Sequence, residues 1–216
     1  MDSTVTFVAI VLVLGAILLG SYLYEKQRTE MLKGVSKQIG LPFYPKGNPS
    51  LIDELSQFHL FSQGNSKEIT NLFHGQAQQA EVAMFGYHYR IGIGKNSQTH
   101  SQTVIYFRSS SLNLPRFALR PEKLFHKIGQ VFGYQDVDFD SHPMFSQYYL
   151  LRADDVERVR CVFSDHVLAY FEQKRGVGTE GGGDQLIFYR SEKRIHPYQM
   201  RFFLEEGFRV LELFKQ

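Results

Sequence analysis

A long uncharged run close to the amino terminus limits what this chain can fold into. No Asp, Glu, Lys or Arg lies between Asp2 and Glu25. The 20 residues Val5–Tyr24 would rise about 30 Å as an α-helix, which is the thickness of the hydrocarbon core of a bilayer. A helix also satisfies its own backbone hydrogen bonds, as the interior of a membrane requires. The sequence therefore predicts a transmembrane helix over Val5–Tyr24, with the lipid bilayer as its partner.

Two other interpretations of this run are a cleaved signal peptide and a buried core helix. A signal peptide normally has basic residues before its apolar segment and small residues at its cleavage site. No Lys or Arg precedes this run, and Leu18, Leu19 and Gly20 do not form a cleavage site of small residues. The pattern favours a span that stays uncleaved.

The basic residues directly after the run predict its orientation. They are Lys26, Arg28, Lys33 and Lys37. Because basic residues flanking a span stay on the cytoplasmic side, we expect the N-terminus outside and the rest of the chain in the cytoplasm, at the plasma (inner) membrane. The single cysteine, Cys161, agrees with a reducing compartment, since it has no partner for an internal disulfide.

The sequence divides into three parts. Residues 1–24 are expected to form a short tail and the transmembrane helix, residues 25–49 a juxtamembrane helix and linker, and residues 50–216 a cytoplasmic domain. Gly40 and Pro42 predict the end of the juxtamembrane helix, because both residue types interrupt helices. The third part is long enough to build one domain with its own hydrophobic core.

The third part places its main strand signals before most of its helix signals. β-Branched and aromatic residues predict strands over 68–73, 81–93, 103–108, 116–119 and 186–190. Apolar spacing and capping residues predict helices over 51–58, 121–132, 156–163 and 165–173, and a last helix after Pro197. We therefore expect an α+β fold with one antiparallel β-sheet packed against helices. A shift in the alternation at Gly86 predicts a β-bulge there.

Residues 176–183, GVGTEGGG, contain the spacing G-x-G-x-x-G at Gly176, Gly178 and Gly181. A dinucleotide-binding loop needs a strand before these glycines and a helix after them. Here a predicted helix comes before and a predicted strand after. The glycines are better explained as a turn from helix to strand, in which Gly181–Gly183 supply positive φ angles. We expect no nucleotide and no other cofactor.

The polar segment 92–100, GIGKNSQTH, connects two predicted strands. A phosphate-binding Walker loop would require Gly at Tyr89 and Ser or Thr at Asn96, so that motif is absent. The segment is either a hairpin connection or a loop that contacts a partner. The candidate contact residues are Lys95, Asn96, Ser97 and His100.

A small acidic cluster lies in residues 136–142, DVDFDSH. Its members are Asp136, Asp138, Asp140 and His142. A calcium-binding EF-hand loop counted from Asp136 would need Gly at Ser141 and Glu at Gln147, and it has neither. The alternation with Val137 and Phe139 favours an edge strand with exposed carboxylates. A metal site is the alternative, but we expect no bound metal.

The search for catalytic motifs finds no G-x-S-x-G sequence and no zinc-binding pattern. A net charge of +2 with interspersed signs predicts no nucleic-acid binding. We therefore expect a protein-interaction, scaffold or assembly module, which binds a partner protein. The alternative is a membrane-tethered hydrolase whose site gathers distant residues in space. Its candidates are His59, His74, His88 and His100 together with the acids of residues 136–140.

Two segments of the chain carry a family resemblance. They are residues 134–163, YQDVDFDSHPMFSQYYLLRADDVERVRCVF, and residues 181–190, GGGDQLIFYR. From about Leu41 to its end, the chain resembles uncharacterised bacterial single-span membrane-anchored proteins with a cytoplasmic domain of unknown function. The resemblance implies a membrane-anchored class of protein and no particular activity.

Overall fold

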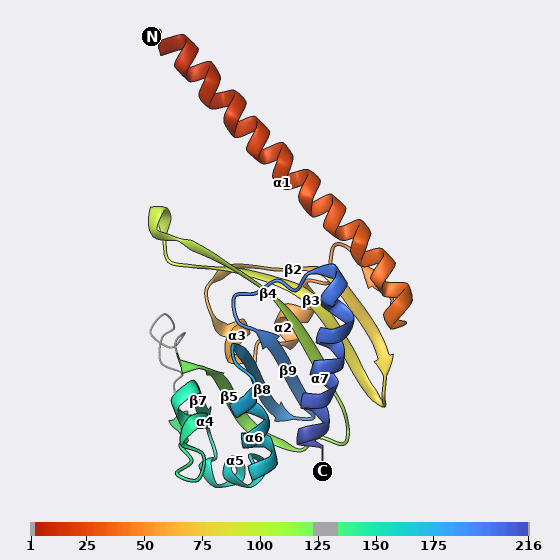
Figure 1. Cartoon of the computed structure of the whole chain (residues 1–216), viewed down its shortest axis with the longest axis vertical. Coiled ribbons are helices and arrows are strands. Elements are labelled where there is room, and N and C mark those ends of the chain that lie inside the picture. Colours follow the sequence, from red (N-terminus) through yellow and green to blue (C-terminus); the bar gives the residue numbers. More distant parts are fainter. Residues whose placement is uncertain (1–2, 123–133, 216) are drawn as a thin grey trace.

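Helix α1 (Ser3–Ile39) leaves the body of the protein as one unbroken helix (Figure 1). The computed structural model describes residues 3–122 and 134–215. Within these residues, α1 is the one helix that is long and apolar enough to cross a membrane, and none of its apolar window is buried. The predicted apolar helix is therefore present, and it is not a core helix.

The second half of α1 packs against the body of the protein. Leu32 and Val35 are buried in the main hydrophobic core. Gly40, with a φ of 73°, ends the helix in the left-handed conformation that favours glycine. Leu41 is buried in the same core, and the chain then forms the first strand of the sheet. The juxtamembrane segment thus contributes both core residues and a strand.

The body is built on one antiparallel sheet, as predicted. Among the described residues, nine strands lie in the order β1-β2-β3-β4-β9-β8-β5-β7-β6, and each neighbouring pair is antiparallel. The strands are β1 (Phe43–Tyr44), β2 (Asn65–Ala77), β3 (Ala80–Ile91), β4 (Gln98–Arg108), β5 (Leu114–Pro121), β6 (Gln135–Asp136), β7 (Tyr149–Ala153), β8 (Val177–Gly183) and β9 (Gln185–Arg190).

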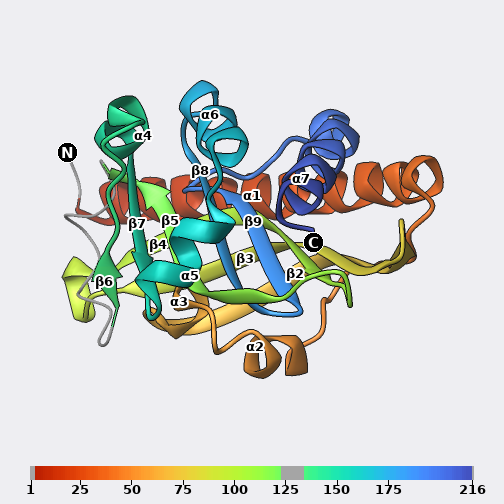
Figure 2. The same ribbon diagram turned by 90° about the horizontal axis from the view of Figure 1, so that it is seen from below.

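Helices cover both faces of this sheet (Figure 2). The main core lies under α1, α4, α5, α6 and α7, and a second core lies on the opposite face under α2 and α3. The α+β class is therefore correct. The helices after α1 are α2 (Ser50–Glu54), α3 (His59–Ser62), α4 (Pro143–Tyr148), α5 (Val156–Val162), α6 (Asp165–Gln173) and α7 (Met200–Phe214). The helix predicted over 121–132 lies almost entirely outside the described residues.

The helical half bears out some of its local signals, although the side chain of Ser164 makes no capping hydrogen bond at the start of α6. Asp155 caps α5, because its carboxylate accepts a hydrogen bond from the backbone N–H of Arg158. Cys161 is exposed on the same helix. Pro197 opens a short 3-10 turn that leads into α7. The apolar stripe of α7 faces the core through residues that include Phe203, Leu211 and others at helical spacing.

The alternation of β3 has a different cause from the one predicted. Val82 and Met84 belong to the main core, whereas Phe85 and Tyr87 belong to the second core, so both faces of this strand are buried. The pairing of β3 with β4 runs without a shift through Gly86. The expected bulge at this residue is therefore wrong. The irregularity lies in the neighbouring strand β2, between Thr70 and Phe73.

The glycine-rich segment forms strand β8, so the expected turn from helix to strand is wrong for Gly181 and Gly182. Two glycines of the segment have a positive φ: Gly176, at 75°, just before β8, and Gly183, at 61°, which leads into β9. A Cβ atom on Gly181 would lie 2.5 Å from a ring carbon of Phe117 on β5. Glycine is needed in this strand because the side chains of neighbouring strands cross over it.

Candidate functional site

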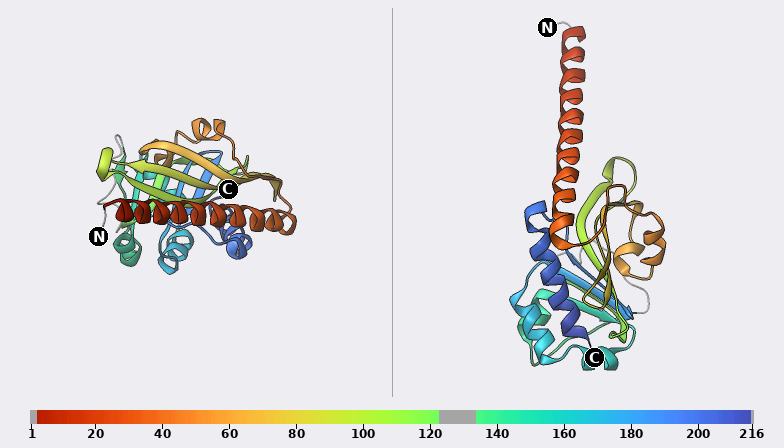
Figure 3. Two further views of the ribbon diagram at one scale, coloured as in Figure 1. Left: turned by 90° about the horizontal axis from the view of Figure 1, so that it is seen from above. Right: turned by 90° about the vertical axis from the view of Figure 1, so that its right-hand side faces the viewer.

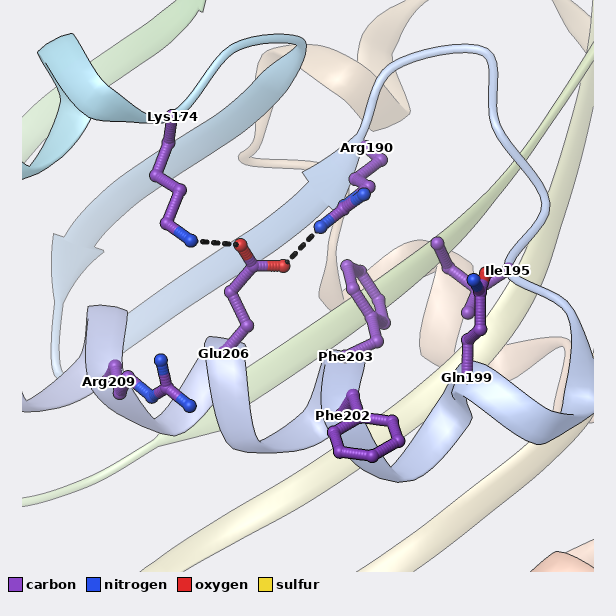
Figure 4. A pocket seen from close by; sticks show the side chains of 8 residues that line it. All are labelled: Lys174, Arg190, Ile195, Gln199, Phe202, Phe203, Glu206 and Arg209. Atoms are coloured by element: carbon purple, nitrogen blue, oxygen red, sulfur yellow. Dashed lines mark hydrogen bonds and ion pairs between the residues drawn. The ribbon is translucent and has the colours of Figure 1, made fainter.

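A pocket of about 320 Å³ opens between helix α7 and the end of β9 (Figure 4). Its walls come from the residue after α6, the last residue of β9, and helix α7 with the segment before it. The lining residues are Lys174, Arg190, Ile195, Gln199, Phe202, Phe203, Glu206 and Arg209.

The carboxylate of Glu206 organises the polar side of the pocket. Glu206 is only 6% exposed, and a buried carboxylate is costly unless it is paired. Its two oxygens contact two cations, Arg190 at 2.8 Å and Lys174 at 3.5 Å. Figure 4 shows both side chains reaching toward this carboxylate from neighbouring elements.

The pocket carries more positive than negative charge. Lys174, Arg190 and Arg209 line it with one carboxylate, Glu206. Within the described part of the chain, Arg209 forms no ion pair, and the Nε of Arg190 is buried without a hydrogen-bond partner. Arg209 is exposed and offers donors to an anionic ligand, whereas the Nε of Arg190 is enclosed by the protein.

A tyrosine close to Lys174 adds a further donor. The Nζ of Lys174 lies 5.9 Å from the ring centre of Tyr170. The hydroxyl of Tyr170 is buried without a hydrogen-bond partner among the described residues. Burial, reinforced by the negative charge of Glu206, raises the pKa of Tyr170 to about 12. The hydroxyl therefore stays protonated at neutral pH.

Large aromatic side chains are exposed at the start of α7. Phe202 is 68% exposed and Tyr198, four residues earlier, is 77% exposed. The neighbouring Phe203 points inward instead and stacks on Phe188 at 5.4 Å between ring centres. Phe202 thus adds an apolar wall to a pocket whose other wall is basic.

This combination suits recognition better than catalysis. The eight lining residues include no His, Ser, Thr or Cys, and their one carboxylate is already held by two cations. A carboxylate beside an apolar group is the ligand chemistry that fits, because guanidinium groups bind carboxylates strongly and aromatic rings bury apolar surface.

The four histidines named as catalytic candidates do not meet in one pocket. His88 lines a hollow of about 640 Å³ beside Glu25 and Glu68, and His100 lines an adjacent one of about 680 Å³. His74 instead pairs with Glu81 at 2.9 Å. His59 and the acidic cluster line neither hollow.

Their surroundings hold two half-buried histidines, His59 and His88, neutral. Burial, reinforced by Arg194, lowers the pKa of His88, and burial with Arg120 lowers the pKa of His59 to about 4. The Nδ1 of His59 lies 2.9 Å from the Nε2 of Gln63. In a neutral ring this nitrogen is the acceptor and the amide is the donor.

The acidic cluster begins at the edge of the sheet, but the edge strand β6 ends at Asp136 and does not extend through Asp138 and Asp140 as the alternation predicts. Val137 and Phe139 are buried, and Asp136, Asp138 and Asp140 are exposed. Asp136 forms an ion pair with Arg152 at 2.7 Å, and His142 lies 3.9 Å from Asp165. Within residues 3–122 and 134–215, no group of three or more His, Cys, Asp or Glu side chains is arranged to hold a metal ion.

The predicted contact loop is the tip of the β3–β4 hairpin together with the start of its second strand, β4. Lys95, Asn96 and Ser97 are exposed. His100 lies further down on β4, where its ring stacks on Tyr89 at 5.2 Å and its Nδ1 contacts Glu192 at 3.0 Å. His100 therefore lies on β4 next to the tip and not in the exposed tip itself.

Sequence reasoning missed a buried ion pair within the glycine-rich strand. Glu180 is 1% exposed, and its carboxylate contacts Arg120 at 2.5 Å and accepts a hydrogen bond from the hydroxyl of Tyr189 at 3.0 Å. The backbone N–H of Leu60 also donates to it. The signal in the sequence was a single acidic residue, Glu180, between Thr179 and Gly181. Small neighbouring residues leave room for the partners of a buried carboxylate.

The α7 pocket was also missed. Its basic residues are far apart in the sequence and meet only in the folded chain. One signal was present: Phe202 lies outside the apolar stripe of the last helix, where a large aromatic residue has no core to fill.

Comparison with known proteins adds one finding about the fold. No family model matches the chain, and no match was found among curated protein sequences. The chain is similar in structure to the mycobacterial trehalose monomycolate transport factor A, TtfA, with a TM-score of 0.62 and 12% identity. The match covers 86% of this chain and 91% of the other. At this identity, the likeness shows that the two chains share a fold.

Proposed function

We propose that this chain is a single-pass membrane protein whose domain faces the cytoplasm and binds a partner protein there, as an adaptor or assembly factor. Support for the anchor comes from α1, because none of its apolar stretch is buried by the rest of the described protein. Such a surface is unfavourable in water and favourable in lipid. Support for the orientation comes from Lys26, Arg28, Lys33 and Lys37, which follow the span.

The α7 pocket is the observation that carries the binding role. Its occupant in this proposal is a segment of a partner protein that places a carboxylate against Arg209 and Arg190 and an apolar side chain against Phe202. Exposed aromatic and arginine side chains contribute most of the binding energy at many protein interfaces. The excess of positive charge selects an acidic segment over a basic one.

The fold shared with TtfA supports the same class of function. That protein is named a transport factor, and the present chain has a similar fold over 86% of its length. An accessory factor of a membrane transport or assembly system needs an anchor and a binding surface, and it needs no active site of its own. The separation of the four candidate histidines favours this role over the hydrolase alternative.

Site-specific photo-crosslinking in native membranes tests the binding role. A photoreactive amino acid at Phe202 should give a discrete crosslinked adduct to another protein. The same probe at Glu212, which is exposed on α7 outside the pocket, should not give that adduct. Arg209→Glu should abolish the adduct at position 202, whereas Arg201→Glu should leave it. The pocket would be ruled out as the binding site if the adduct forms equally at both probe positions or if Arg209→Glu leaves its yield unchanged.

A reporter fusion tests the orientation separately. A reporter that is active only in the cytoplasm, fused after Gln216, should be active. Activity only of a reporter that works outside the cytoplasm would reverse the assignment.

A further inference from the structure

The tip of the β3–β4 hairpin carries an apolar side chain that is exposed to solvent. Ile93 is 90% exposed at the tip of the hairpin. It lies between Gly92 and Gly94, which both have positive φ angles, and Lys95 follows. Residues 91–98, IGIGKNSQ, include one basic and no acidic residue.

The end of the apolar span is fixed to a loop of the body. Glu25 directly follows Tyr24, and both of its oxygens accept hydrogen bonds from Arg194, at 2.6 and 2.7 Å. One turn later, the buried guanidinium of Arg28 donates to the backbone oxygen of Ile195 at 2.7 Å. Residues 194–195 are therefore held within about one helical turn of the end of the span.

The same loop is fixed to the base of the hairpin. The backbone N–H of Thr103 donates to the oxygen of Lys193 at 3.1 Å, and the N–H of Ile195 donates to the hydroxyl of Thr103 at 2.9 Å. The ion pair of Glu192 with His100 at 3.0 Å adds a contact closer to the tip. A continuous set of hydrogen bonds thus connects the end of the span with β4.

From this base, the hairpin extends toward the same side as the span. The pairs from Thr103 to Gln98 continue without a shift in register, and five strand residues advance about 17 Å. The right-hand view of Figure 3 shows the hairpin turn rising beside α1 in the direction of the N-terminus. The tip is therefore carried toward the level at which the span ends.

We propose that the tip of the β3–β4 hairpin is a second membrane-binding element, in which Ile93 enters the interface of the bilayer and Lys95 contacts anionic lipid headgroups. This inference rests on the membrane span of the proposed function. Charge supports it, because the cytoplasmic leaflet is negative and attracts basic residues close to its surface. The two flanking glycines let the backbone turn sharply enough to present Ile93 outward.

Fluorescence of the full-length protein in lipid nanodiscs tests the proposal. In a Cys161→Ser background, a polarity-sensitive label is placed on Asn96→Cys at the tip. A matched label on Ser110→Cys follows the opposite end of β4 and is exposed. A third label on Leu23→Cys reports whether α1 spans the bilayer. Each sample is measured with and without a lipid-attached quencher, in nanodiscs of neutral lipid alone and with added phosphatidylglycerol.

The label at position 96 should show a blue-shifted emission and quenching by the lipid-attached quencher, and the label at position 110 neither. Ile93→Asp should abolish both effects at position 96. Lys95→Glu should remove the increase in quenching that phosphatidylglycerol produces. Quenching at position 23 but not at position 96 would overturn the hairpin proposal alone. Loss of quenching at position 23 would overturn the membrane span and this inference with it. Protection of position 96 only after a second protein is added would also overturn lipid as the partner.

Discussion

Both carboxylate oxygens of Glu25 accept hydrogen bonds from the guanidinium of Arg194, although the two residues lie 169 positions apart in the sequence. The hydrogen bond with Arg194 lowers the pKa of Glu25, and the same bond raises the pKa of Arg194. This pair joins the exposed part of α1 to the body at the point where the helix begins to pack.

Breaking this pair should loosen the loop before α7. We expect Arg194→Met to lower the free energy of unfolding by about 0.5–1 kcal/mol, since both side chains are partly exposed and solvent screens them. Amide hydrogen exchange over residues 191–196 should accelerate, and it should stay unchanged in Glu205→Gln, which breaks an exposed pair on α7. Because the pKa of Glu25 is lowered in the folded state, this stabilisation is present above about pH 4.3 and is lost as the pH falls below it.

Truncation should separate the two halves of α1. A chain that begins at Glu25 keeps Leu32 and Val35 in the core, so we expect it to be soluble and cooperatively folded. A chain that begins at Leu41 loses both side chains, and removal of each buried aliphatic residue costs about 2–5 kcal/mol. Circular dichroism melts of the two fragments measure the difference. Equal melting temperatures would show that the packing of α1 does not stabilise the domain.

Substitutions in the glycine-rich strand should act on stability and not on a ligand. Gly181→Ala places a Cβ atom 2.5 Å from the ring of Phe117 and 2.8 Å from Leu114, which predicts a loss of about 1–3 kcal/mol. Gly182→Ala is the matched control, because its nearest atom is a flexible side-chain carbon of Arg116 at 3.3 Å. Thermal melts measure both variants.

The same melts test for a nucleotide. NAD, NADP, FAD, ATP and GTP should not raise the melting temperature of the wild type. A ligand at 100 times its dissociation constant would stabilise the protein by about 2.7 kcal/mol. A reproducible rise that disappears in a folded Gly181→Ala variant would contradict the structural role of this strand.

His59 should make the protein less stable in mild acid. Burial, with Arg120 close by, lowers its pKa to about 4 in the folded state. The unfolded chain then binds the proton more readily, so stability should fall as the pH drops from about 6.5 towards about 4. Partial exposure limits the effect to the order of 2 kcal/mol. His59→Gln should flatten the dependence measured by urea unfolding, and the exposed control His166→Gln should not.

The long regular elements could be predicted from the sequence, and the short and glycine-rich ones could not. Strands such as β3 and β4 have enough β-branched and aromatic residues for their strand preference to be visible. β1 and β6 have two residues each, so they carry no periodicity. β8 contains four glycines and little intrinsic strand preference. Its extended form is set by pairing with β5 and β9, which no local pattern reveals.

The candidate site was harder to predict for a related reason. Helical spacing identified the buried face of α7. It did not identify the pocket, because the role of Phe202 depends on where the side chains of Lys174 and Arg190 lie in the folded chain. These residues belong to different elements, and the local sequence does not determine how those elements are arranged around the sheet. The acidic cluster was different, because the alternation of Val137 and Phe139 with the acidic residues is enough to identify which side chains are buried.

The absence of a break in α1 has a mechanical consequence. A helix that continues from its exposed half into the core without a hinge transmits a tilt of one half directly to the other. The domain then moves as a lever, so residues far from the helix axis are displaced more than residues beside it. Insertion of one residue after Tyr24 would turn the two halves by about 100° relative to each other and separate them by about 1.5 Å. Because the helix is continuous, the number of residues in its apolar segment sets the angle at which every surface of the domain is presented.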